Sequence, residues 1–166
     1  MLFLAVGIFL PSKRHLERSI TINAPASVVF GEVNNFRNWQ KWSPWLDLDP
    51  EATVKYEGPE EGVGSAMIWA SDHPEIGKGS QKIILSDPNR HIICRLDFAD
   101  WEGKVTAGWK FEALTAHKTR VTWTNDSDSK GKIFYKYINV MIYSKLGKTY
   151  VRGLQSLKTH VESIYQ

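Results

Sequence analysis

The chain has 166 residues, of which 42% are hydrophobic and 23% charged, and its formal net charge is +3. This composition is typical of one globular domain and excludes a disordered chain. Because basic residues alternate with acidic ones along the sequence, no concentrated basic stretch indicates nucleic-acid binding. The single cysteine, Cys94, excludes an internal disulfide and any multi-cysteine metal site.

The first ten residues, Met1–Leu10, are apolar apart from one glycine and are soon followed by a Lys-Arg pair. Ten helical residues rise about 15 Å, half of a hydrocarbon core, so this segment alone cannot span a bilayer. Two interpretations are open: the end of a transmembrane helix whose upstream half is absent from this sequence, or an apolar tail packed on the domain or a partner. In the first, the basic pair places the domain on the cytoplasmic side. We therefore separate residues 1–12 from a domain of residues 13–166 and expect a cytoplasmic protein, membrane-anchored in the first case.

Alternating apolar residues predict a first strand over Leu16–Asn23. The sequence Asn-Ala-Pro at positions 23–25 is typical of a helix start, since proline is tolerated in the first turn and asparagine can cap it. Apolar side chains follow at helical spacing as far as Phe36. A cluster of tryptophans comes next: Trp39, Trp42 and Trp45. Such a cluster caps a core or lines a pocket.

Six further strands are predicted, over Ala52–Tyr56, Val63–Ser71, Gly77–Ser86, His91–Phe98, Val105–Ala113 and Thr119–Thr124. Short polar turns join them, which indicates an antiparallel meander. A period near 3.6 then predicts a long helix with one apolar stripe: Tyr143, Leu146, Tyr150, Leu154, Leu157, Val161 and Ile164. Gly147 and Gly153 interrupt it, and mark either close contact with the sheet or room beside a cavity.

Several stretches carry a family resemblance: Arg18–Pro25, Phe36–Trp45, Gly77–Ser80, Arg120–Trp123 and Gly153–Lys158. With the order of elements, they resemble the polyketide cyclase/dehydrase branch of the START-like superfamily (SRPBCC, Bet v 1-related), from Pro11 to the end of the chain. The resemblance implies an α+β helix-grip fold, with a curved antiparallel sheet wrapped around a long C-terminal helix and short helices between the first two strands. It also implies a cavity between sheet and helix that binds lipids, sterols or polyketides. Related bacterial proteins often begin with a transmembrane helix, which favours the anchor interpretation.

The first functional hypothesis is binding of an apolar or aromatic small molecule or lipid in that cavity. The residues expected to line it are Trp39, Trp42, Trp69, Gln81, Trp109, Phe111, Trp123, Tyr150 and Leu154. The aromatic residues are either simple core or cavity wall, and Gln81, a polar residue among apolar neighbours, either orients a ligand or bonds to the backbone. No cofactor or metal is expected, because the five histidines lack metal-ligand spacing and no nucleotide-binding motif is present.

The alternative is a polyketide cyclase/dehydratase-like enzyme acting on a hydrophobic substrate in the same cavity. Such chemistry needs convergent titratable groups, for which His73, Asp72, Tyr143 and Tyr150 are the candidates. The family resemblance transfers no catalytic motif, so the identity of the ligand and the existence of a reaction stay open. A third hypothesis is an interaction module recruited to a membrane through the N-terminal segment. The oligomeric state is also open.

Overall fold

The computed structural model describes residues 11–99, 101–130 and 132–166, with side chains described for all of these except 102 and 133–141. Seven strands form one antiparallel sheet in the order β1-β7-β6-β5-β4-β3-β2. The strands are β1 (Lys13–Ile22), β2 (Thr53–Glu57), β3 (Ala66–Ala70), β4 (Lys78–Asp87), β5 (His91–Phe98), β6 (Trp101–Thr115) and β7 (Lys118–Asp128). The helices are α2 (Ala26–Asn34), the short 3-10 helix η1 (Phe36–Lys41) and α3 (Ile133–Ile164).

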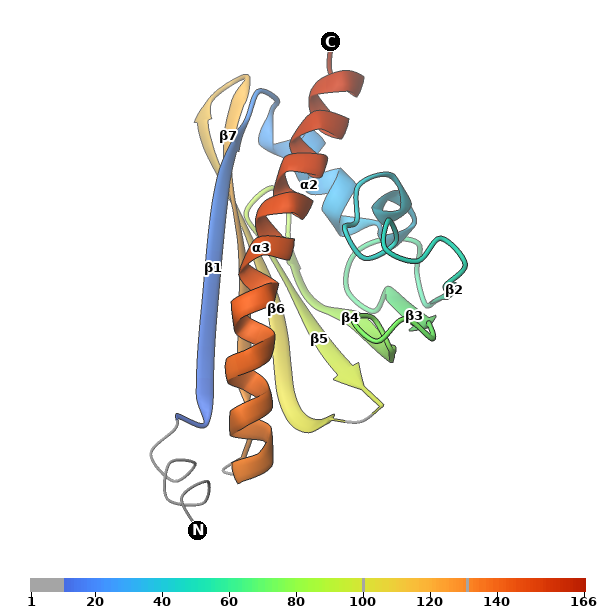
Figure 1. The fold of residues 1–166 in the computed structure, drawn as a ribbon. Helices are drawn as coiled ribbons and strands as arrows, with labels where there is room; N and C mark the ends of the chain where they lie inside the picture. The colour runs from blue at the N-terminus through green and yellow to red at the C-terminus, as the bar shows by residue number, and fades with distance from the viewer. Residues whose placement is uncertain (1–10, 100, 131) are drawn as a thin grey trace.

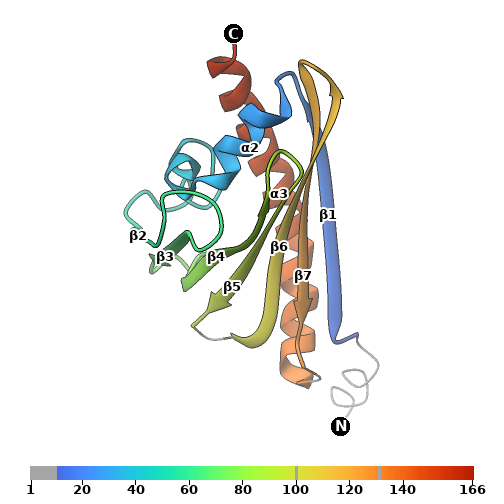
Figure 2. The ribbon, with the colours of Figure 1, turned by 180° about the vertical axis from the view of Figure 1, so that it is seen from behind.

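The sheet curves around α3, which crosses its concave face, while α2 and η1 cover one end of the sheet (Figure 1). The C-terminal end of α3 lies beside α2, whereas β1 and α3 both begin at the opposite end of the molecule. Seen from behind, the strands lie in front of α3 (Figure 2). This arrangement confirms the predicted helix-grip fold.

An aromatic cluster fills the centre of the grip. We call it the aromatic block and define it as Trp39, Trp42, Trp109, Trp123 and Tyr150. Each of these side chains is at most 2% exposed. The indole rings of Trp109 and Trp123 stack with centroids 4.2 Å apart, and the Trp39 N–H donates to the carbonyl of Val33 at 3.0 Å. The tryptophan-rich connector therefore packs inward onto β6, β7 and α3.

The two glycines of α3 mark close contacts with the sheet side of the grip. A Cβ at Gly153 would lie 2.9 Å from both Pro44 Cγ and Trp123 Cζ3. A Cβ at Gly147 would lie 2.7 Å from Arg18 Nη2. Both glycines therefore mark close contacts, which is one of the two roles predicted for them; the other was room beside a cavity.

Several elements extend beyond their predicted ends. The first strand begins at Lys13 rather than Leu16, and β7 continues to Asp128 rather than Thr124. Sequence periodicity missed these parts because apolar residues defined the predicted faces, whereas the added strand residues that face inward are polar. The β1–β7 pairing extends to Lys13↔Asp128.

The expectation about Met1–Leu10 lies outside the described residues. Within the part of the chain that the structure describes, no helix combines the length and apolarity needed to cross a bilayer.

Candidate functional site

The strand register divides the inner face of the sheet into rows that run across neighbouring strands. Successive inward side chains on one strand lie two residues apart, so each row is one step farther along the grip. The first row crosses the aromatic block and contains Trp123, Trp109 and Ile92. The second contains Asn125, Ala107, Cys94 and Ile83, and the third contains Ser127, Val105, Leu96 and Gln81.

Side-chain size falls sharply from the first row to the second. On β7 an indole is followed by Asn125 and then Ser127, and on β6 an indole is followed by Ala107 and then Val105. These four residues are nonetheless buried. On the sheet side these small side chains leave room for larger groups, and on β7 the side chains of Tyr143 and Tyr150 from α3 reach into this room. The candidate ligand-binding site therefore lies between α3 and the second and third rows.

The apolar residues around these rows become more exposed away from the aromatic block. Ile83 and Cys94 in the second row are at most 1% exposed, whereas Leu96 in the third is only partly buried. Trp69 on β3 and Leu146 on α3 are also partly buried and pack against the core. We call this part of the grip the open end. It offers apolar surface that a ligand can cover.

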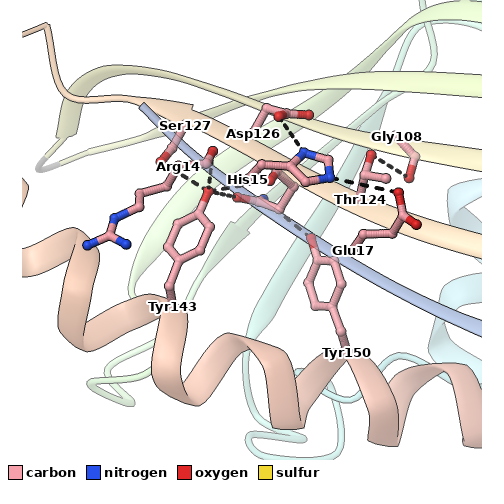
Figure 3. A network of polar contacts seen from close by, with 10 residues as sticks. Arg14, His15, Glu17, Gly108, Thr124, Asp126, Ser127, Tyr143 and Tyr150 are labelled. Atoms are coloured by element: carbon pink, nitrogen blue, oxygen red, sulfur yellow. Dashed lines mark hydrogen bonds and ion pairs between the residues drawn. The ribbon is translucent and has the colours of Figure 1, made fainter. Parts of the chain in front are cut away.

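A polar cluster lies where the second and third rows meet α3. The Tyr143 hydroxyl lies 2.8 Å from Asn125 Oδ1 and 3.0 Å from Ser127 Oγ. It is also 3.2 Å from the carbonyl oxygen of Arg14. Asn125 Nδ2 in turn donates to the Tyr150 hydroxyl oxygen at 3.3 Å. Figure 3 shows both tyrosines pointing from α3 toward the strands. The structure thus brings together two of the four predicted acid/base candidates.

Burial sets the protonation state of these tyrosines. Desolvation is the main reason that the pKa values of Tyr143 and Tyr150 are raised above their usual range. Both hydroxyls therefore stay protonated at neutral pH and act as hydrogen-bond donors or acceptors rather than as bases. Burial likewise raises the pKa of the Cys94 thiol to about 12, so this cysteine is a small apolar wall residue.

The other two acid/base candidates, His73 and Asp72, lie in the turn between β3 and β4. His73 Nδ1 accepts a hydrogen bond from the backbone N–H of Glu75 at 3.2 Å, and Asp72 is exposed. The same turn reaches α3, because Lys145 Nζ donates to Glu75 Oε1 at 3.0 Å. The hydrogen bond from Lys145 is the main reason that the pKa of the Glu75 carboxyl is lowered. His73 is thus held beside the grip by backbone contacts.

The predicted ligand-lining residues fall into two groups. Seven are packed core, at most 4% exposed: Trp39, Trp42, Trp109, Phe111, Trp123, Tyr150 and Leu154. The other two lie toward the open end, where Trp69 covers Gly79 of the neighbouring strand and Gln81 is 5% exposed. Gln81 is buried, and its amide makes no hydrogen bond to any residue that the structure describes.

Sequence reasoning missed Asn125, Ser127 and Arg14 as inward-facing residues. Asn125 and Ser127 continue the alternation of Trp123, and Arg14 continues that of Leu16. Extending the alternation through polar residues would have found them.

Two hollows on the outside of the molecule are separate from the grip. One of about 350 Å³ lies between η1 and the outer face of α3, and one of about 300 Å³ lies beside Arg37 and Tyr56. Among the described residues, no three histidine, cysteine, aspartate or glutamate side chains come together as a metal-binding group.

A curved antiparallel sheet that grips a long C-terminal helix defines a helix-grip protein. The chain belongs to the family described as polyketide cyclase / dehydrase and lipid transport, whose model matches residues 13–162. This confirms the resemblance inferred from the sequence and supports a role in hydrophobic-ligand binding or cyclisation. No curated protein matches the chain in sequence.

Solved structures share the fold at low sequence identity. A norcoclaurine synthase from Thalictrum flavum, a point mutant with a transition-state analogue, superposes with a TM-score of 0.70 and 13% identity, covering 93% of this chain and 97% of that one. The Zhui aromatase/cyclase from Streptomyces sp. R1128 gives a TM-score of 0.65 and 21% identity, covering 90% and 94%. The di-domain aromatase/cyclase BexL of the BE-7585A biosynthetic pathway gives 0.66 and 18%, covering 90% of this chain and 46% of that one. Because the identities are this low, the similarity to these structures shows the fold alone.

Proposed function

We propose that this protein binds an apolar small molecule or lipid between α3 and the second and third rows of the sheet. The supporting observation is the step from Trp123 and Trp109 to the small residues Asn125 and Ala107 on the same strands. Protein interiors are packed as densely as organic crystals, so small side chains opposite a helix must be covered by larger groups. Tyr143 and Tyr150 cover Asn125 and Ser127 on β7, and the proposal concerns the remaining surface over β6, β5 and β4. An apolar ligand meets that requirement there.

In this proposal the aromatic block forms the closed end of the site and the open end admits the ligand. Of the residues predicted to line the cavity, Trp123, Trp109 and Tyr150 then contact the ligand only from the closed end. Trp69, Gln81 and Leu96 contact it along its length.

The proposal is tested by placing a large side chain in the proposed ligand space. N-Phenyl-1-naphthylamine, a neutral apolar probe that fluoresces when it leaves water, is titrated into the wild type, Ala107→Trp and Thr106→Trp. Thr106 is the matched control, because it is the preceding residue on β6 and faces the opposite side of the sheet. We expect saturable binding by the wild type and Thr106→Trp, and at least a tenfold loss in Ala107→Trp.

Thermal unfolding of the same variants shows whether a loss of probe binding comes from a blocked site or from a misfolded protein. An indole placed in vacant ligand space leaves the melting temperature nearly unchanged, whereas overpacking a filled core costs about 1–3 kcal/mol. Absence of saturable probe binding by the wild type, or wild-type binding by a folded Ala107→Trp, would overturn the proposal.

The alternative function is a cyclase/dehydratase-like enzyme using the same site. The observation that favours it is the polar cluster, in which Tyr143 and Tyr150 place hydroxyls beside the proposed ligand space. Against it, no inward strand position among the described residues carries a histidine or a carboxylate that could serve as a base. Binding without turnover is therefore the better supported function.

A further inference from the structure

The inner face of the sheet carries charge at one edge. Among the described strand residues that face α3, only Arg14 and Arg18 are charged, and both lie on β1. They alternate with Leu16, Ile20 and Ile22, which are partly or fully buried. Arg14 is partly buried, whereas Arg18 is exposed. A partly buried cation beside apolar surface, as Arg14 is, normally has a partner.

Neither arginine has a carboxylate partner among the described residues. Arg14 Nε is buried and has no hydrogen-bond acceptor in the part of the chain that the structure describes. Arg18 Nη1 donates to the backbone carbonyl of Glu17 at 2.7 Å, and its Nη2 lies over Gly147 of α3. The acidic side chains near β1 serve other groups, since Asp126 and Glu17 both approach His15 (Figure 3). Both guanidinium groups therefore keep donors available to a ligand.

The surrounding elements intensify this positive charge. Together β1 and α3 contain eight of the chain's 21 lysines and arginines but only two of its 18 acidic residues, Glu17 and Glu162. Glu162 is near the far end of α3, where it accepts hydrogen bonds from Asn23. On α3, Lys145 donates to Glu75 and Arg152 to the carbonyl of Pro44, so the basic residues at the β1 edge are chiefly those of β1 itself: Lys13, Arg14 and Arg18. Such an edge attracts anions.

The unpaired buried polar atoms of the interior are also donors. Besides Arg14 Nε, the indole N–H groups of Trp42, Trp109 and Trp123 are buried without an acceptor among the described residues. The Tyr150 hydroxyl accepts from Asn125 Nδ2, and no described acceptor receives its own proton. An interior with surplus donors favours a ligand rich in acceptor oxygens.

The register connects this charged edge to the ligand space. Arg14 is the β1 member of the third row, and it is followed across the sheet by Ser127, Val105, Leu96 and Gln81. Neighbouring strands lie about 4.8 Å apart, so the row spans roughly 19 Å from β1 to β4. That length suits an extended chain of about a dozen carbons with a head group at one end.

We propose that the ligand is an anionic amphiphile, with a carboxylate or phosphate ester head bound by Arg14 and an apolar body lying along the third row. Arg18, which pairs with Trp123 of the first row, adds positive charge along the same strand. This inference rests on the proposed function and specifies its ligand class. The planar guanidinium binds either oxyanion through paired hydrogen bonds. Gln81, at the other end of the row, contacts the tail end of the ligand or a polar group there.

The test is displacement of the neutral probe by dodecanoate, dodecyl phosphate and dodecanol, each below its micelle concentration. These ligands share a twelve-carbon chain and differ in the head group. We expect the wild type to prefer at least one of the two anions over dodecanol by tenfold or more. Comparison of dodecanoate with dodecyl phosphate shows whether the site prefers a carboxylate or a phosphate head group.

Variants locate the head group. Arg14→Gln and Arg18→Gln should reduce or remove the preference for the anion while dodecanol binding is unchanged. Arg14→Lys should retain part of the preference, because charge remains but paired hydrogen bonding is lost. Lys110→Gln is the matched control, since it removes the same charge from an exposed residue of β6 and should bind as the wild type does. Thermal unfolding checks that each variant is folded.

The outcomes separate this inference from the function on which it rests. Equal binding of dodecanol and both anions by the wild type would overturn the anionic head while leaving apolar-ligand binding intact. A preference that persists in both Arg→Gln variants would also overturn it. If neither the probe nor any dodecyl compound binds, the proposed function itself fails.

Discussion

The ring of Tyr150 lies parallel to the indole of Trp123, with centroids 3.9 Å apart and planes inclined by 17°. Trp123 also stacks on Trp109, so three rings join the middle of α3 to the central strands β7 and β6. This stack fixes where α3 crosses the sheet. It also fixes the boundary between the filled part of the grip and the rows of small side chains.

Removing one ring of this stack should be costly. Trp109 is 2% exposed, so Trp109→Ala should lower the free energy of unfolding by about 3–5 kcal/mol through lost burial and a new cavity. The control Arg120→Ala, on the outer face of β7, should change it by less than about 0.5 kcal/mol. Urea denaturation followed by far-UV circular dichroism measures both. A Trp109→Ala loss below about 1 kcal/mol would mean that the stack contributes little to stability.

Substitution of two helical glycines by alanine should have different effects on stability. Alanine at Gly31 of α2 meets no atom within 4 Å, so Gly31→Ala should stabilise the protein by about 1 kcal/mol through helix propensity. Alanine at Gly153 gains the same propensity but collides with the stiff rings of Pro44 and Trp123. Overpacking of this kind costs about 1–3 kcal/mol, so Gly153→Ala should be neutral or destabilising. Thermal and urea unfolding measure the change in the free energy of unfolding for each variant. If Gly153→Ala stabilised the protein as much as Gly31→Ala does, the close contact at Gly153 would be contradicted.

The outer face of the β1–β7 pair contains a pH-dependent contact. His15 Nδ1 lies 2.7 Å from Asp126 Oδ1, and this hydrogen bond is the main reason that the pKa of His15 is raised, with Glu17 adding a smaller effect. Because the pKa is higher in the folded state, the contact stabilises the fold below about pH 6.5 and is lost as pH rises through the folded pKa. Both side chains are more than half exposed, so the contribution should stay below about 1 kcal/mol.

The measurement compares His15→Gln with the wild type at pH 5.5 and pH 8.5. The variant should be less stable at the lower pH and equal to the wild type at the higher. Nuclear magnetic resonance titration of His15 in Asp126→Asn provides the control, since its pKa should fall toward the ordinary value. An equal stability difference at both pH values would show that the charge of His15 is irrelevant.

Local patterns predicted the order of elements well, because apolar alternation marks strands and a 3.6-residue period marks the long helix. The inward orientation of Trp109 and Trp123 is predicted from this alternation alone, and their burial confirms it. The same criterion failed where inward residues are polar. Asn125, Ser127 and Arg14 fell outside the predicted strands, and they contribute the polar cluster and the charged edge. The packing of the tryptophan connector onto β6 and β7 depends on tertiary contacts that no local pattern encodes.

The pairing of β1 with β7 has a consequence for synthesis. Ser19 and Thr122, whose hydroxyls lie 2.8 Å apart across these strands, are separated by 103 positions in the chain. As the ribosome releases the chain from its N-terminus, β1 emerges first and then lacks its only strand neighbour until β7 follows. Contacts between such distant segments form slowly, and an unpaired strand edge is prone to aggregate meanwhile. The helix grip is therefore completed late, after the pairing edge of β1 has stayed open during the synthesis of the residues that precede β7.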